Sequence, residues 1–397
     1  MRPSELSNFT SDELLASLHL NKSKEAVAKR FLELGMPGNK TEQYKSFSVK
    51  PLLQRDYTLV QTQQKELQTA GEILEIRDGV VTSLPEGADI TFTTEGSVDM
   101  THFDALYYMG HLLSPRYIVV NIKSDVDITI VHHITLEQTL IPYRIIIKIA
   151  ESSQVQVYET FHTENSQGSL LLYGLDVHLN RDSMLTWLRN QTATADEAVV
   201  IGSHHYDIGE RAKLTIQTFD FGSGTAMHLY NNDLAAHTET RVSHLLFASA
   251  KARRGNVVML RHNGVSATSR HLAKSILKDN ATGIFDGRIQ VNQSARYAKT
   301  SQNSKAILLN NRAFMKSKPQ LEIYIDELEA SHGSTIGQLD EAALFYLCSR
   351  GITTDEARKM LILAFANEMI EEVQETTLSE QIGDGFESAY HTQKDRS

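Results

Sequence analysis

The most restrictive feature of the chain is a recurring pattern: a polar pair, a small residue, and then apolar residues at alternating positions. The central residues of its copies are Ser153, Ser183, Ala212, Thr240, Ser269, Ala295, Ala313 and Ala330. Successive copies are 30, 29, 28, 29, 26, 18 and 17 residues apart. Each interval of nearly thirty residues accommodates two strand-like runs. Such a period is typical of a solenoid, in which every coil buries its inner face against its neighbours.

The same spacing has a second interpretation. Turns that recur every roughly 8–12 residues in an antiparallel β-sandwich also produce approximate periods. The regularity of the pattern also declines after Ala295. Spacing alone therefore leaves the β-helix-like solenoid and the β-sandwich open.

Helical signals flank this β region. Residues 9–35 predict two helices, which end at Met36-Pro37-Gly38, and residues 61–69 predict one more short helix. From Glu72 the pattern changes to strands. We therefore expect an N-terminal helical region at 1–70 and a β core at 71–335.

The C-terminal region, 336–397, predicts further helices. A helix that begins after Asp340 carries Leu344, Leu347 and Cys348 on one stripe and stops at Gly351. Thr353 and Glu356 have the spacing of a capping box for the next helix.

The second of these helices is apolar over much of its circumference. Its main predicted stripe is Ala357, Met360, Leu361, Ala364 and Phe365, and Ile362, Leu363 and Ile370 widen that stripe. Such a helix often has a second surface to cover. The polar residues after about 375 predict a partly disordered tail.

Charge and cysteine content exclude several classes of protein. The chain has 397 residues, with 49 acidic and 39 basic side chains and a net charge of −10, which disfavours binding to nucleic acid or to anionic membranes. It lacks a run of eighteen apolar residues, and MRPSELSNFTSDELL does not resemble a secretion signal. We therefore expect a soluble cytoplasmic protein. A single cysteine excludes an internal disulfide.

Several longer motifs resemble the SufB/SufD family of iron–sulfur cluster assembly proteins, the SufD side most closely. They are GIFDGRIQV, KPQLEIYIDE, SHGSTIGQLDEAALFYLCSRGI, and Gln302 ahead of a run of leucines. A weaker similarity is FLELGMPGNKTEQYKSF, where the family usually has a Trp and this chain has Tyr44.

The resemblance implies a right-handed parallel β-helix flanked by helical segments. It also implies a non-catalytic scaffold subunit of a SufBCD-type complex. A SufB-like chain would pair through the last β strands and a SufC-like ABC-type ATPase would dock on the C-terminal helices, with a homodimer possible when partners are absent. ATP binding would then act on residues near 340–373 and shift the shared interface.

A chain with one cysteine cannot supply by itself the roughly four ligands, mostly thiolates, of an ordinary cluster. We therefore expect no tightly bound cofactor. We expect instead a transient iron or iron–sulfur cluster that is shared with a partner supplying the thiolates.

His332, in EASHGST, is the one candidate metal ligand. It matches a histidine of the family, but the cysteine that many SufD-like chains carry two residues earlier is replaced here by Ala330. A neutral imidazole can substitute for a thiolate in some clusters. The alternative is that His332 only makes local bonds at a strand-to-helix corner.

The remaining histidines and the cysteine favour structural roles. The adjacent pairs His132-His133 and His204-His205 cannot clasp one ion, because neighbouring strand residues point to opposite faces. A group spaced near the repeat suggests turn or surface positions unless two meet on successive coils: His162, His178, His228, His237, His244, His262 and His271. Cys348 is expected to be a buried or half-buried, inert thiol, and Trp187 a core aromatic.

Two rival functions remain. A secreted-type β-helix enzyme acting on polysaccharide would use acids such as Asp176, Asp182 and Asp220, but the chain shows no secretion signal. A SufB-like scaffold would need sulfur acceptors, and the β region carries no cysteine. No phosphate-binding loop, GxSxG, HExxH or CxxC motif is present, so we expect no self-contained catalytic site.

Overall fold

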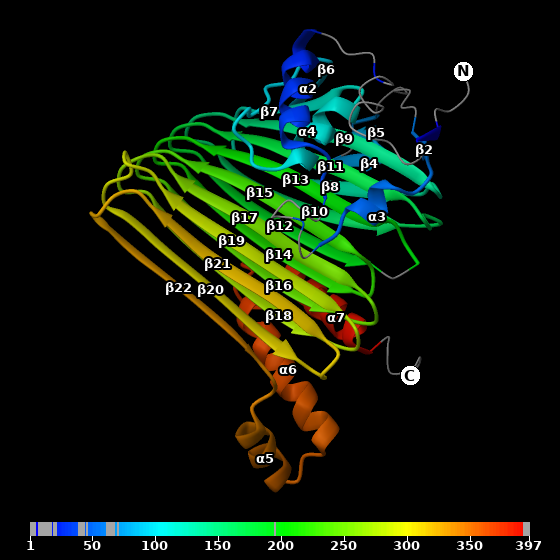
Figure 1. Cartoon of the computed structure of the whole chain (residues 1–397), viewed down its shortest axis with the longest axis vertical. Helices are drawn as coiled ribbons and strands as arrows, with labels where there is room; N and C mark the ends of the chain where they lie inside the picture. Colours follow the sequence, from blue (N-terminus) through cyan, green and yellow to red (C-terminus); the bar gives the residue numbers. More distant parts are fainter. Residues whose placement is uncertain are drawn as a thin grey trace.

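The computed structural model describes residues 18, 22–38, 44, 47–60, 71–193 and 196–391, and the two short strands at 5–6 and 68–69. Two β-sheets form its body, and each coil of the solenoid contributes one strand to each sheet. Helices lie at both ends (Figure 1). The predicted β-helix-like solenoid with flanking helices is confirmed. The sandwich alternative is wrong, because the long strands pair in parallel with the strands of the preceding and following coils.

The long strands belong alternately to two sheets, and the odd-numbered ones, from β9 to β21, form sheet A. Its long strands run in the order β9, β11, β13, β15, β17, β19 and β21. Its members are β1 (Glu5–Leu6), β2 (Tyr57–Leu59), β6 (Ala88–Thr93), β7 (Tyr117–Ile122), β9 (Thr139–Ile149), β11 (Leu170–Leu179), β13 (Val199–Ile208), β15 (Ala226–Leu234), β17 (Arg253–His262), β19 (Thr282–Val291) and β21 (Phe314–Ile323).

The second sheet, sheet B, ends at β22 on the same side of the molecule. Its members are β3 (Gln68–Thr69), β4 (Ile73–Arg77), β5 (Val80–Leu84), β8 (Val126–Ile134), β10 (Gln154–Thr163), β12 (Met184–Ala193), β14 (Lys213–Gly222), β16 (Glu239–Ala248), β18 (Thr268–Leu277), β20 (Ala298–Leu308) and β22 (Leu328–Gly337).

The coil period continues to the end of the solenoid. The residues in register at the start of the sheet B strands are Gln154, Met184, Lys213, Glu239, Thr268, Lys299 and Glu329, which are 26 to 31 residues apart. The irregular spacing seen after Ala295 in the sequence arises because Ala313 belongs to the opposite corner, immediately before β21 in sheet A.

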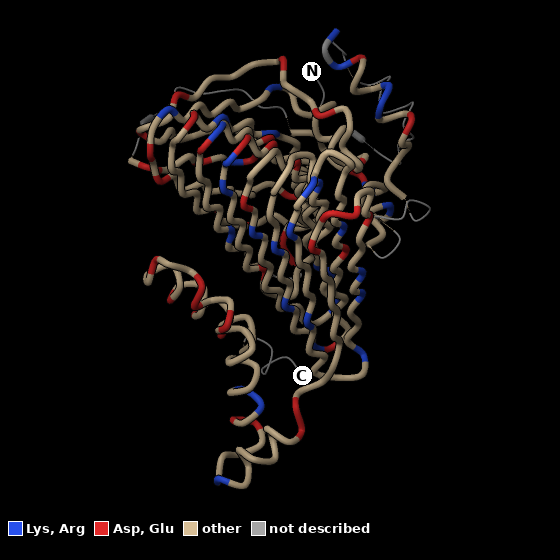
Figure 2. The backbone as a smooth tube through the Cα atoms, turned by 90° about the vertical axis from the view of Figure 1, so that its left-hand side faces the viewer, with Lys and Arg blue, Asp and Glu red and all other residues tan. Residues whose placement is uncertain are grey.

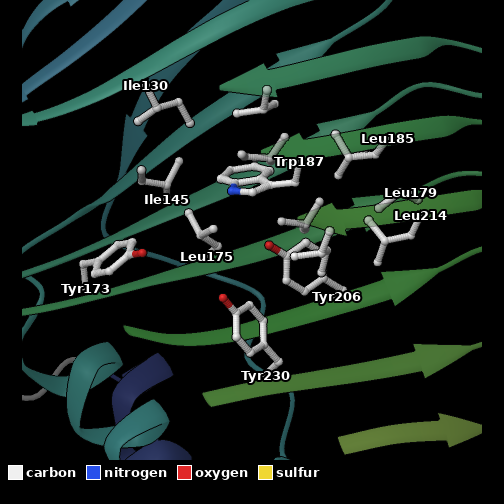
Figure 3. Packing of buried hydrophobic residues seen from close by; sticks show 14 of the residues in the cluster. Ile130, Ile145, Tyr173, Leu175, Leu179, Leu185, Trp187, Tyr206, Leu214 and Tyr230 are labelled. Atoms are coloured by element: carbon white, nitrogen blue, oxygen red, sulfur yellow. The ribbon is translucent and has the colours of Figure 1, made fainter. Parts of the chain in front are cut away.

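The core lies between the two sheets. Figure 3 shows Trp187, Tyr206 and Tyr230 among aliphatic side chains such as Leu175 and Leu214. Trp187 is buried, as predicted, and its indole Nε1 donates to Glu159 Oε2 at 2.8 Å. The indole thereby satisfies a carboxylate that the solenoid encloses completely.

The N-terminal helices cover the outer face of sheet A at its first coils. They are α2 (Lys22–Leu34), α3 (Lys50–Leu53) and α4 (Ala105–Leu113). Helix α4, which the sequence analysis did not predict, is buried at every position and is capped by the side chain of Asp104. Helix α2 confirms one of the two helices expected in 9–35, whereas residues 9–17 and 61–67 lie outside the described residues.

Helices α5 (Glu341–Ser349), α6 (Thr354–Ile370) and α7 (Thr376–His391) follow the last strand. The Asp340 cap, the left-handed Gly351 and the Thr353–Glu356 capping box are confirmed. The tail expected to be partly disordered instead forms α7, because Ile382 and Phe386 are buried against Phe221 and Phe247 of sheet B. Residues 392–397 lie outside the described residues.

The stripe predicted to be the core face of α6 is confirmed only in part. Ala357 is buried as predicted, whereas Ala364 and Met360 are exposed. The rest of the buried face includes two of the widening residues and consists of Ile362, Ala366, Met369 and Ile370. Lys274 of β18 fixes the helix further, since its Nζ donates to the Phe365 carbonyl at 2.9 Å and pairs with Glu368. No helix among the described residues is both long enough and apolar enough to span a membrane.

Most of the histidines expected in turns or at the surface are in fact buried. His228, His244, His262 and His271 lie inside, where each has a polar side chain as partner, whereas His162 and His237 are exposed. The length of one coil determines the spacing of these histidines along the chain. Whether each one is buried depends on its place in the coil and on the side of the strand from which it projects. These buried histidines make the fold sensitive to acid.

We predict that the chain loses stability between pH 7.5 and 5. Burial lowers the pKa of His262 and of His271 to about 4, whereas in the unfolded chain they titrate near ~6.5. Below ~6.5 the unfolded state binds more protons, and each such histidine costs about 1.4 kcal/mol of unfolding free energy per pH unit. Burial raises the pKa of Asp104 to about 6, so protonation of this carboxyl increases the free energy of unfolding as the pH falls. This is a single group, and it offsets only part of the effect of the histidines.

Urea unfolding at the two pH values checks this prediction. The midpoint should be lower at pH 5, and H271Q should reduce the difference, whereas H237A, at an exposed turn, should leave it unchanged. A midpoint equal or higher at pH 5 would contradict the account.

Candidate functional site

The solenoid is open at its C-terminal end. Strand β21 is the last strand of sheet A and β22 the last of sheet B, so each pairs on one side only (Figure 1). Large apolar side chains are exposed on or next to these strands: Phe314, Ile323, Tyr324 and Ile336. The end therefore presents unpaired backbone groups together with apolar surface, which is the usual signature of a strand-pairing interface.

His332 lies in the middle of β22, in register with Gln302 of β20. Gln302 points inward, because its Nε2 donates to the Gly287 carbonyl of sheet A at 3.0 Å. Residues in register on parallel strands share a face, so His332 occupies an inward-facing position of the last coil. It is nevertheless exposed, because no further coil covers it.

The inward-facing positions that lead to His332 change character along the solenoid. In successive sheet B strands they are Ile128, Val157, Trp187, Ile216, Val242, His271, Gln302 and His332. Five apolar residues are thus followed by three polar ones. This row therefore ends in hydrogen-bonding side chains, beside apolar core residues of the last coils such as Ile289 and Leu321.

The GIFDGRIQV motif is explained by this arrangement. A Cβ atom at Gly287 would lie 2.6 Å from Oε1 of Gln302, so any other residue would displace the Gln302 amide from this position. The Gln302 amide thereby links sheet B to sheet A one coil before the open end, and its Oε1 lies 3.4 Å from Nδ1 of His271.

His332 is therefore not at a strand-to-helix corner, as one interpretation of the sequence held. Ala330, two residues earlier on the same strand, shares its face, so a cysteine at that position would point in the same direction as the imidazole. Within the described residues, the group of three ligand side chains close enough to hold an ion is Asp99, His205 and Asp233, which does not include His332. Its role as a ligand stays a prediction.

Helix α5 projects beyond the solenoid and packs on α6 (Figure 1). None of its residues is fully buried, and the predicted stripe of Leu344, Leu347 and Cys348 is half-buried. On the opposite side, Phe345 is 75% exposed and Tyr346 is 56% exposed. We call the exposed pair Phe345 and Tyr346 the α5 surface.

Cys348 has the half-buried position expected for a structural thiol. Its Sγ lies 3.8 Å from Oγ1 of Thr354, at the start of α6. The cysteine and His332 lie on different elements, α5 and β22.

The C-terminal helices are strongly acidic. Residues 341–391 contain 10 acidic and 3 basic side chains, and Figure 2 shows red segments predominating along these helices. The excess lies at residues 368–387, whereas residues 340–360, around α5, carry 4 acidic and 3 basic side chains.

The acids proposed for a polysaccharide-active site do not form one. Asp176 pairs with Arg144, Asp182 with Arg211 and Asp220 with Arg254. Asp176 and Asp220 are fully buried, whereas Asp182 lies in an exposed turn. Burial by itself raises the pKa of Asp176, but Arg144 and His111 bring it well below its ordinary value. A buried, ionised and paired carboxylate cannot serve as the general acid of glycoside hydrolysis.

Sequence reasoning missed two arrangements of histidines. His204 and His228 lie on neighbouring coils, with Nε2 and Nδ1 3.2 Å apart, and His228 Nε2 continues to Gln191 Oε1 at 2.9 Å. They form a buried hydrogen-bonded chain. His205 faces the opposite side of β13, as the alternation predicts, and joins the outer group with Asp99 and Asp233. No signal in the sequence pointed to this group, because Asp99 lies far from His205 and Asp233 along the chain.

Comparison with known proteins identifies the family. A sequence profile described as the SufBD core domain of the SUF system for iron–sulfur cluster assembly matches residues 132–365, more than half of the chain. The chain belongs to the SufB/SufD family. The matched region runs from β8 to α6 and therefore contains both His332 and the α5 surface.

Individual relatives place the chain close to SufD. It is 32% identical over 186 residues to the iron–sulfur cluster assembly protein SufD of Escherichia coli, which covers 45% of this chain and 44% of the relative. It is 24% identical over 265 residues to a SufBD family protein of Synechocystis, with 64% and 57% covered. A chloroplastic protein of Arabidopsis thaliana, ABCI7, is 37% identical over 114 residues, 28% of this chain and 24% of the relative. These alignments span about half or less of the relatives' lengths.

Proposed function

We propose that this chain is a non-catalytic scaffold subunit of a SUF-type complex for iron–sulfur cluster assembly. The observation that carries the proposal is the open last coil, with one imidazole at its inward-facing position. The edges of β21 and β22 are suited to pairing with the corresponding end of a SufB-like chain, since main-chain hydrogen bonds would extend both sheets. Without that partner, a second copy of this chain could occupy the same edges.

In such a pair His332 would lie at the boundary between the subunits. The partner would supply thiolates for the nascent cluster, and His332 would supply one nitrogen ligand. Family membership and the single, half-buried Cys348 support this division of roles. Iron and sulfide are the cargo of the complex, so this chain contributes position rather than a resident cofactor.

The α5 surface is the proposed docking site for a SufC-like ATPase. Its exposed aromatic residues fit a partner with an apolar surface. Only residues 338–340 separate β22 from α5. A movement of α5 on ATP binding would therefore be transmitted to the strand that carries His332.

We predict that H332A lowers the iron and sulfide content of the reconstituted complex by at least about twofold, because one of about four ligands is lost. The complex would be co-expressed with its SufB-like and SufC-like chains and reconstituted anaerobically. H332C should retain the cluster, since a thiolate replaces the imidazole. H237A, an exposed histidine in a turn, is the matched control. Unchanged iron and sulfide in an intact H332A complex would refute the ligand role.

We also predict that the double variant F345S/Y346S weakens ATPase binding at least about tenfold, because exposed aromatic residues at interfaces typically each contribute on the order of 2 kcal/mol. Isothermal titration with the purified ATPase measures the effect. The control is M184S, which replaces an exposed apolar residue of β12, remote from α5 along the solenoid. Equal affinity for the double variant and the control would place the docking site elsewhere.

A further inference from the structure

Three ligand-type side chains converge on the outer face of sheet A. His205 comes from β13 and Asp233 from the neighbouring β15, whereas Asp99 comes from the segment between β6 and α4. His205 Nδ1 lies 3.4 Å from Asp99 Oδ2 and 3.9 Å from Asp233 Oδ2. All three ligand atoms lie within 4.8 Å of one another.

The other carboxylate oxygens of the group are held by hydrogen bonds. Asp99 Oδ1 accepts from the backbone N–H and the hydroxyl of Thr101, at 2.8 and 2.7 Å. Asp233 Oδ1 accepts from Arg261 Nη1 at 2.7 Å and from Asn263 Nδ2 at 3.0 Å. Each carboxylate thus keeps its Oδ2 for the centre of the group. Outer donors of this kind orient ligands in known metal sites.

Asn231 lies at the centre of the group. Its Nδ2 lies 3.2 Å from Asp99 Oδ2, 3.1 Å from His205 Nδ1 and 3.1 Å from Asp233 Oδ2. The two amide hydrogens satisfy the two carboxylates, and His205 Nδ1 donates to Asp99 Oδ2 or lacks a donor, according to its tautomer. The carboxylates are only 15% and 16% exposed, so two acidic side chains meet here with little access to water.

A cation at this position would bind the two carboxylate oxygens and the imidazole nitrogen directly. Turning the Asn231 amide by half a turn would bring Oδ1 to the centre as a fourth ligand, at the cost of the contact that Oδ1 makes with Arg261 Nη2 at 3.4 Å. Metal–ligand bonds of about 2.0–2.2 Å place neighbouring ligand atoms roughly 3–3.5 Å apart. The separations of 3.4 and 3.9 Å from His205 Nδ1 to the two carboxylates lie at or near that range, and all three ligand atoms would draw together from within 4.8 Å.

We propose that Asp99, His205 and Asp233, completed by Asn231, form a binding site for a divalent first-row transition metal ion. Three oxygen donors with one imidazole suit ions such as Mn²⁺, Fe²⁺, Co²⁺ or Zn²⁺, whereas Ca²⁺ and Mg²⁺ favour oxygen ligands throughout. The partial exposure of the two carboxylates gives the ion access from solvent.

The ion would join the segment before α4 to two coils of the solenoid. Asp99 is separated from His205 and Asp233 by more than a hundred residues, so a shared ion stabilises their association. Its backbone N–H also donates to Tyr107 of α4 at 3.1 Å, so fixing Asp99 helps to fix that helix. The site does not depend on the proposed function, because His332 lies on the last strand of the other sheet.

The test begins with the full chain, stripped of metal. Titration with Co²⁺, followed by visible absorption, and calorimetry with Mn²⁺, Zn²⁺ and anaerobic Fe²⁺ should show one saturable site and a rise in the unfolding temperature. H205A and D233N should each weaken binding at least about tenfold and remove the thermal shift. D207N removes the same charge from the position in register with Asp233 and should bind normally.

Two further variants test the role of Asn231 and the independence of this site from His332. N231D places a third carboxylate at the centre, so it should bind metal more tightly and be less stable than the wild type without metal. H332A should leave this site unaffected, which separates it from the proposed cluster ligand. The proposal is overturned if the wild type binds no ion stoichiometrically, if H205A and D233N bind it as the wild type does, or if N231D binds no more tightly.

Discussion

Hydrogen bonding between successive coils is the interaction on which the rest of this structure depends. Each long strand bonds to the strands one coil before and one coil after it. The turns repeat the arrangement, since left-handed residues such as Ser152, Asp182 and Tyr297 donate their N–H to a carbonyl of the following coil. A stack of this kind satisfies its backbone everywhere except at its ends. At the N-terminal end short strands extend both sheets, namely β1, β2 and β6 in sheet A and β3, β4 and β5 in sheet B, whereas β21 and β22 are long edges that pair on one side only.

The interior follows the same logic. One inward-facing row of sheet B is apolar as far as Val242 and then continues as His271, Gln302 and finally His332. The last coil therefore presents an imidazole at the position that a further coil would cover. The C-terminal helices continue directly from β22, so under the proposed function a movement of α5 on ATP binding would reach this strand.

Local signals in the sequence predicted local structure well. The Asp340 cap, the capping box at Thr353 and the stop at Gly351 depend on neighbouring residues only, and all three are present. Features set by distant contacts were missed. The buried face of α6 is chosen by sheet B, the burial of the repeated histidines by strand orientation, and helix α7 by Phe221 and Phe247. The group around His205 needs Asp99, which only the folded chain brings near.

The central claim is that the last coil is completed by a partner. Hydrogen–deuterium exchange of the free chain and of its complex with the SufB-like subunit tests this claim most directly. The account predicts that amides of β21 and β22 exchange rapidly in the free chain and become protected in the complex, whereas those of β18, paired on both sides, are protected in both. A stable complex in which β21 and β22 exchange as fast as in the free chain would contradict it.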